Sequence, residues 1–146
     1  MHIFLADDDM DDRVLFYEAI RLTTPSAKMT MANNGFELME ALLLHDTSHP
    51  PLVFLDLNMP IKNGHECLAE IRASDRLKNL PIIIYSTSSD PRDIDKCYNG
   101  GADFYIHKPT SFNDLLELVK IVLNLNRTTH IPPEKEHFVL KSMAES

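Results

Sequence analysis

The sequence is poor in the features that mark exported, membrane-spanning and disulfide-stabilised proteins. Two cysteines in 146 residues are too few for a disulfide framework. Cys67 and Cys97 each lie within an apolar helical pattern, which favours buried free thiols over a bridge or a metal site. No apolar run approaches the ~18 residues of a membrane span, and the N-terminus lacks the segments of a signal peptide. We therefore expect a cytoplasmic protein that does not contact a membrane.

Positive charge is also scarce. The chain has 14 Lys and Arg residues against 22 Asp and Glu, which gives a formal net charge of -8. Nucleic-acid phosphates require a basic protein face, so DNA or RNA binding is not expected. The length fits one domain that can bury an apolar core without cross-links.

What the chain does contain is a regular alternation of short apolar runs and longer amphipathic segments. The short runs are predicted to be buried strands, and the longer segments carry apolar residues at helical spacing. The expected strands cover residues 2–6, 28–31, 51–55, 81–85 and 104–107, and the expected helices cover about 10–22, 35–43, 64–71, 91–99 and 111–125. Parallel neighbours need right-handed crossovers, so five strand-helix repeats predict an α/β fold with a doubly wound parallel sheet and helices on both faces.

The last part of the chain differs from this pattern. Residues 127–146 contain Pro132-Pro133, a charged segment and only a brief apolar run at Phe138-Val139-Leu140. We expect residues 1–126 to form the domain and residues 127–146 to be a tail or appended arm, too short to be an output domain.

Chemically distinctive side chains follow four of the predicted strands. Asp7 and Asp8 follow the first strand, Asp56 follows the third, Ser86 lies at the end of the fourth, and Lys108 follows the fifth. The carboxyl ends of parallel strands share one edge of the sheet, where open α/β folds place their ligands. Clustered carboxylates repel one another unless a cation neutralises them, and an all-oxygen site suits Mg²⁺. A lysine opposite the metal would supply positive charge to a phosphoryl group.

Three further acidic residues have a structural interpretation. Asp9, Asp11 and Asp12 lie where the first helix begins, and acidic side chains there cap free amides and complement the helix dipole. We assign these three residues mainly to that role.

These residues carry a resemblance to the receiver domains of two-component response regulators, over residues 1 to about 125. The acidic pair matches Asp7-Asp8, and the pattern D-x-x-M-P-x-x-x-G runs from Asp56 through Met59-Pro60 to Gly64. The family's remaining landmarks follow in order along the chain: the switch hydroxyl matches Ser86, the switch aromatic matches Tyr105, and the Lys-Pro pair matches Lys108-Pro109. The resemblance implies a flavodoxin-like three-layer sandwich, (βα)5, with the strand order 2-1-3-4-5.

The resemblance also implies a function. Asp56 would accept a phosphoryl group from a histidine kinase or histidine phosphotransfer protein. Mg²⁺ would be held by Asp8, Asp56 and the backbone carbonyl of Asn58, with Asp7 acting through water. Lys108 and Ser86 would stabilise the phosphoryl group.

The same resemblance implies a switch and a lifetime control. Ser86 and Tyr105 would change the surface of the fourth helix, fifth strand and fifth helix, and Asn58 and Ser88 would tune dephosphorylation. Lys108-Pro109 would be a cis peptide, at Pro109. Such a protein catalyses only its own phosphorylation and dephosphorylation, and is not otherwise an enzyme. The segments around Asp56 and Ser86 are similar to those of single-domain regulators that include phytochrome-associated ones.

Two alternatives from other classes stay open. A haloacid-dehalogenase-type phosphatase also uses an Asp nucleophile and Mg²⁺, but needs a second Asp two residues later, where this chain has Asn58. A flavodoxin-like FMN module shares the fold, but its phosphate loop after the first strand is rich in hydroxyls and glycine, and the loop here is acidic.

The predicted fifth helix has more apolar residues than one buried stripe requires. Its surplus predicts either a homodimer through the face of the fourth helix, fifth strand and fifth helix, or a cover formed by residues 127–146 folding back. We favour the dimer. The fold-back would use Ile131, Phe138, Val139 and Leu140.

Overall fold

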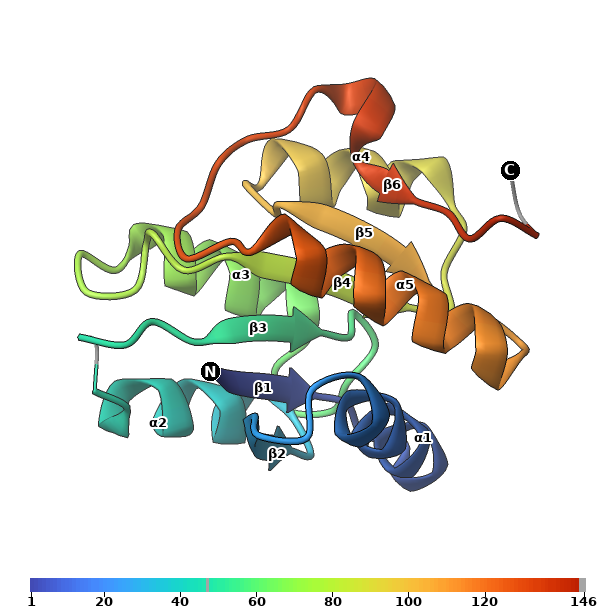
Figure 1. Ribbon diagram of the computed structural model, residues 1–146. Coiled ribbons are helices and arrows are strands. Elements are labelled where there is room, and N and C mark those ends of the chain that lie inside the picture. Colours follow the sequence, from blue (N-terminus) through green and yellow to red (C-terminus); the bar gives the residue numbers. More distant parts are fainter. Residues whose placement is uncertain (47, 145–146) are drawn as a thin grey trace.

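The computed structural model describes residues 1–46 and 48–144. A central parallel sheet carries helices on both faces (Figure 1). Its elements, in chain order, are β1 (His2–Ala6), α1 (Met10–Thr23), β2 (Lys28–Ala32), α2 (Gly35–Leu44), β3 (Leu52–Leu55), α3 (Gly64–Ala73), β4 (Ile82–Ser86), α4 (Pro91–Asn99), β5 (Phe104–His107), α5 (Phe112–Leu125), the 3-10 turn η1 (Lys135–His137) and β6 (Val139–Leu140). None of the described helices is both long and apolar enough to cross a lipid bilayer.

The strand order is β2-β1-β3-β4-β5-β6, and every pair of neighbours is parallel. The predicted order 2-1-3-4-5 is therefore confirmed for the first five strands. The sixth strand was not predicted. It pairs with β5 through Tyr105 opposite Val139 and Ile106 opposite Leu140.

Two apolar cores lie on opposite faces of the sheet. Phe16, Leu118 and Val122 represent the face covered by α1 and α5, while Leu38 and Ile71 represent the face covered by α2, α3 and α4. β3 and β4 are buried along their whole lengths, as their continuous apolar runs predict. The carboxyl ends of all the central strands consequently meet at one exposed edge of the sandwich.

Polar side chains cap the N-termini of three helices next to that edge. Asp9 caps α1 by accepting a hydrogen bond from the amide of Asp12, as expected. Asn63 and Glu66 form a capping box at α3, and Ser111 accepts from the amide of Asp114 at α5. These caps fix where each loop ends, and so fix the loops that follow the strands.

Residues 127–144, which we call the arm, fold back onto the sheet and do not extend away from it (Figure 1). Phe138 is 1 % exposed, and its carbonyl accepts a hydrogen bond of 3.0 Å from the amide of Tyr105. Val139 packs against the core on the α4 side of the sheet and Leu140 against the core on the α5 side, while Ile131 remains 47 % exposed. The fold-back, which the sequence favoured less than a dimer, is thus present, and three of its four expected residues provide it.

A buried ion cluster ties the start of the arm to the far end of the sheet. Asp103 is fully buried, and its carboxylate lies 3.1 Å from Arg72 and 2.9 Å from His130. It also accepts hydrogen bonds from the amides of Ile82 and Ile131. Every oxygen of this carboxylate is satisfied, as a buried charge requires.

Candidate functional site

The predicted site residues converge at the carboxyl edge of the sheet. Asp7 and Asp56 extend adjacent strands, since the Asp56 amide donates to Ala6 and the Asp7 amide donates to Ala32, both at 3.0 Å. Asp7, Asp56, Ser86 and Lys108 are all buried. Asp56 Oδ1 also accepts a 2.8 Å hydrogen bond from the amide of Leu57, which fixes the rotamer of the carboxylate.

Lys108 is the positive centre of this edge. Its Nζ lies 2.8 Å from Asp7 Oδ2, 2.8 Å from Asp12 Oδ2 and 3.2 Å from Asp56 Oδ2. The expected cis peptide at Pro109 is not found, because the described residues contain no cis peptide bond. The long lysine side chain reaches all three carboxylates from the trans backbone, so the site geometry does not need the less favourable isomer.

Burial and the neighbouring charges have opposing effects on the pKa of Asp7 and on the pKa of Lys108, and both pKa values end above their ordinary values. Burial raises the pKa of Asp7 to about 6, although the hydrogen bond and charge of Lys108 oppose the rise. For Lys108, burial alone would lower the pKa. The bonds to Asp12 and Asp7 outweigh burial, and the pKa of Lys108 lies above its ordinary value. Lys108 is therefore a permanent cation at physiological pH, and one positive charge faces three carboxylates.

The same edge has the donors of a divalent-cation site. Carboxylate oxygens of Asp7, Asp8 and Asp56 all lie within 4.8 Å of one another. Asp7 Oδ2 is buried and, apart from the ion pair with Lys108, accepts no hydrogen bond from the described residues. Asp8 and Asn58 are exposed and line one hollow beside this cluster. A buried carboxylate oxygen whose one partner among the described residues is an ammonium group, next to the exposed oxygens of Asp8 and Asn58, fits a hard cation that retains some of its water.

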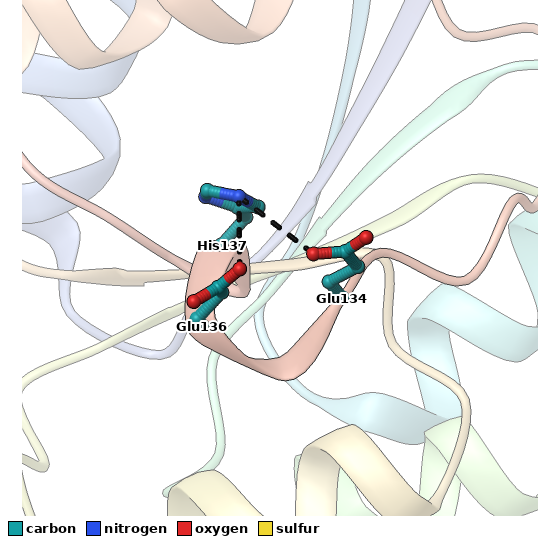
Figure 2. Close-up of side chains that lie close together, drawn as sticks. All are labelled: Glu134, Glu136 and His137. Atoms are coloured by element: carbon teal, nitrogen blue, oxygen red, sulfur yellow. Dashed lines mark ion pairs between the residues drawn. The ribbon is translucent and has the colours of Figure 1, made fainter.

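A second acidic group in the described part of the chain lies on the arm. Figure 2 shows His137 facing both Glu134 and Glu136. Its Nε2 lies 3.9 Å from Glu134 Oε2 and 3.5 Å from Glu136 Oε1. All three side chains are exposed to solvent, unlike Asp7 and Asp56. Ion pairing in water accounts for this group, and it lies away from the strand-end edge.

Asp12 is the residue that the sequence interpretation missed. We assigned it to the first turn of α1, where it does lie, but its carboxylate also contacts Lys108. The signal was its position one turn after the N-cap Asp9, which brings the side chain back over the end of β1. Asp9 and Asp11 remain with helix capping and the helix dipole.

The predicted switch residues are connected through Ser88. Tyr105 is fully buried, and its hydroxyl donates a 2.7 Å hydrogen bond to the carbonyl of Ser88. The amide of Ser88 donates to Ser86 Oγ at 3.2 Å. The hydroxyl expected to contact a phosphoryl group and the expected switch aromatic are therefore bonded to the same residue.

The fold and the residues at the carboxyl edge of the sheet together define the class of protein. A sequence model of the response regulator receiver domain matches residues 3–120, and the chain belongs to that family. Family membership accounts for the doubly wound sheet and agrees with the positions of the acidic pair, Asp56 and Lys108 at the strand ends.

Particular relatives narrow the likeness. The chain is similar to the two-component response regulator ARR17 of Arabidopsis thaliana, with 31% identity over 133 residues that span 85% of this chain and 86% of ARR17. The structure resembles that of the phosphorylated cyanobacterial phytochrome response regulator RcpA, with TM-score 0.77 and 31% identity over 88% of this chain and 96% of that one. It also resembles the Mn²⁺-bound form of response regulator Rcp1, with TM-score 0.74 and 28% identity over 91% and 99% of the two chains.

Proposed function

We propose that this receiver domain accepts a phosphoryl group on Asp56 from a phosphohistidine of a sensor kinase or histidine phosphotransfer protein. The observation that carries the proposal is the contact of Lys108 with Asp56 at 3.2 Å inside a buried cluster with Asp7. Buried ion clusters add little net stability, so stabilising the fold is a weak explanation for this one. A cation held against a carboxylate at the open edge of a parallel sheet is better explained by phosphoryl transfer to that carboxylate.

The reaction needs alignment and charge balance more than proton transfer. An Asp56 oxygen forms the new bond to phosphorus as the phosphorus–nitrogen bond of the donor breaks, and the electron pair leaves with the imidazole. Leu57 orients the carboxylate through its amide, and Lys108 compensates the charge that arrives. Ser86, buried at the neighbouring strand end, supplies the hydroxyl for a phosphoryl oxygen.

We propose Mg²⁺ as the cofactor, held by Asp8, Asp56 and the carbonyl of Asn58, with Asp7 acting through water. The similar Rcp1, whose structure is of a Mn²⁺-bound form, supports a divalent ion as the cofactor. Bound Mg²⁺ would neutralise the acidic edge and draw negative charge from the phosphoryl oxygens. Asp7 Oδ2, whose one partner is Lys108 in the part of the chain that the structure describes, would then gain water held by the ion as a second partner.

Phosphorylation is proposed to signal through α4, β5 and α5. Ser86, Ser88 and Tyr105 connect the acceptor edge to β5, and a shift of Ser86 would pass to Tyr105 through the Ser88 backbone. The likeness to the phytochrome response regulator RcpA supports a photoreceptor kinase as the donor. A second copy of this chain is a candidate partner at the same face, in competition with the arm that now lies on β5.

The two rival functions have less support. Asn58, where a phosphatase of the haloacid-dehalogenase type would have its acid-base Asp, is an exposed amide. The loop after β1 holds carboxylates that would repel the phosphate of FMN. We propose that the chain turns over no separate substrate.

The test is phosphorylation of the purified chain by acetyl phosphate, or modification by beryllofluoride, followed by intact-mass measurement and peptide mapping. We expect modification of Asp56 that requires Mg²⁺ and is abolished in Asp56→Asn. Asp11→Asn is the matched control, because Asp11 is an exposed carboxylate in the first turn of α1, close in sequence to Asp7 and Asp8. Equal labelling of Asp56→Asn, or labelling without a divalent cation, would overturn the assignment.

A further inference from the structure

A chain of polar contacts connects α3 to the switch tyrosine. His65 Nε2 on α3 lies 3.2 Å from Asp93 Oδ1 on α4, and the hydroxyl of Ser88 donates to Asp93 Oδ2 at 2.7 Å. Ser88 in turn accepts the hydroxyl of Tyr105 at its carbonyl. His65 and Asp93 line the same hollow as Asp8 and Asn58, so the chain begins beside the proposed metal site.

Both nitrogens of the His65 ring have partners. Nδ1 lies 3.8 Å from the thiol sulfur of Cys97. Burial raises the pKa of that thiol to about 12, so Cys97 keeps its proton at neutral pH and serves as a hydrogen-bond donor. The tautomer with the proton on Nε2 satisfies both contacts, since Nδ1 then accepts from Cys97 and Nε2 donates to Asp93. The hydroxyl of Ser88, followed by the imidazole of His65, holds the pKa of Asp93 below its usual range, so Asp93 accepts both contacts as a carboxylate. His65 has no free nitrogen for proton transfer, which makes it a poor general base and a good spacer.

The α3 end of this chain is fixed to the acceptor strand. Gly64, the residue before His65, has its Cα so close to the Asp56 carbonyl that a Cβ there would meet the oxygen at 2.2 Å. The Gly64 amide also donates to Leu57 at 2.9 Å. His65 therefore extends from a backbone that is pressed against Asp56, whereas its partner Asp93 belongs to α4.

We propose that His65 is a positioning residue of the phosphorylation site, which through Asp93 holds Ser88 in place and so limits the access of water to phosphorylated Asp56. This rests on the proposed function. Ser88 has four anchors among the described residues: its hydroxyl donates to Asp93 and accepts from the amide of Asp90, its amide donates to Ser86, and its carbonyl accepts from Tyr105. Loss of His65 frees Asp93 to turn toward solvent and weakens the first anchor. The loop after β4 then opens over Asp56, and the phosphoryl group is lost sooner.

The experiment compares His65→Leu with His65→Gln, starting from chains labelled with acetyl phosphate and Mg²⁺. Leucine fills a similar volume but donates no hydrogen bond, whereas glutamine retains a donor for Asp93. We expect the phosphoryl group to decay about three to ten times faster in His65→Leu, as loss of one hydrogen bond of ordinary net strength implies, and to decay near the wild-type rate in His65→Gln. A role in packing alone would leave leucine the milder change. His137→Leu, the same substitution at an exposed histidine of the arm, is the control and should decay at the wild-type rate.

Asp93→Asn tests the same series of contacts from the α4 side, and it covers the case in which His65→Leu does not fold. It should accelerate decay, and adding His65→Leu to it should produce little further change, because both act through one contact. Wild-type decay in His65→Leu, or equal acceleration in leucine and glutamine variants, would overturn the inference and leave the proposed function intact. Absence of label on Asp56 in the wild-type chain would instead overturn the proposed function, and this inference with it.

Discussion

Asp7 is buried as an acid that folding makes harder to ionise, and removing its charge should stabilise the metal-free protein. Burial moves the pKa of Asp7 from 3.8 to about 6. Because the folded state then binds this proton more tightly than the unfolded state does, the contribution of Asp7 to stability is greatest below pH 3.8. It is lost as the pH rises toward 6. Above that pH the ionised carboxylate costs about 3 kcal/mol.

The prediction is that Asp7→Asn raises the free energy of unfolding by about 2 kcal/mol at pH 8 in the presence of a chelator. Lys108 retains Asp12 and Asp56 as partners, so the variant leaves no uncompensated buried charge. Below pH 4 the gain should vanish, because Asp7 is then protonated in the folded wild type and largely so in the unfolded chain.

Urea unfolding followed by circular dichroism, at both pH values, measures these differences. Asp11→Asn, which removes an exposed carboxylate in the first turn of α1, four residues after Asp7, should change stability by less than about 0.5 kcal/mol. Mg²⁺ should stabilise the wild type more than Asp7→Asn, since binding to the folded state adds stability only where the ligands are present. Loss of stability in Asp7→Asn at pH 8, or a gain that persists below pH 4, would refute the reasoning.

Three further predictions follow from the same structure. Lys108→Met leaves the buried carboxylates without their cation, so we expect unfolding in urea to show a loss of about 3–5 kcal/mol, partly restored by Mg²⁺; equal stability with and without Mg²⁺ would contradict this. Phe138→Ala should cost about 3 kcal/mol and accelerate amide exchange at Tyr105, whose N–H donates to the Phe138 carbonyl; unchanged exchange would show that the arm does not depend on Phe138. Light scattering should find the full chain monomeric and a chain ending at Asn126 associated, because removal of the arm exposes the edge of β5; a monomer in both would remove self-association from this face.

The sequence predicted the architecture well because each strand-helix unit carries its own local signals. The apolar runs at β3 and β4 have no polar face, so they had to be central, and the acidic residues that include the cap Asp9 marked where the first helix begins. The positions of Asp56 and Lys108 at one edge then followed from parallel pairing alone.

Long-range contacts account for what the sequence did not predict. Val139-Leu140 is too short to be recognised as a strand, and it forms one because His130 and Asp103 tie the preceding segment to the far end of the sheet. Asp12 looked like any first-turn acid, since its contact is with a lysine 96 residues away. The isomer at Pro109 was taken from the resemblance, and the reach of a flexible lysine cannot be judged from spacing.

The arm also determines how strongly any partner can bind at β5. It is attached near its start through His130 and Asp103 and docks through Phe138, so it behaves as an intramolecular ligand present at an effective concentration on the order of millimolar. A partner that pairs with the same edge must compete with the arm. Its apparent Kd equals its intrinsic Kd divided by the fraction of molecules in which the arm is undocked. Weak encounters are filtered out, and only a partner that binds well beyond this threshold, or a change at Tyr105 that loosens Phe138, makes the edge of β5 available.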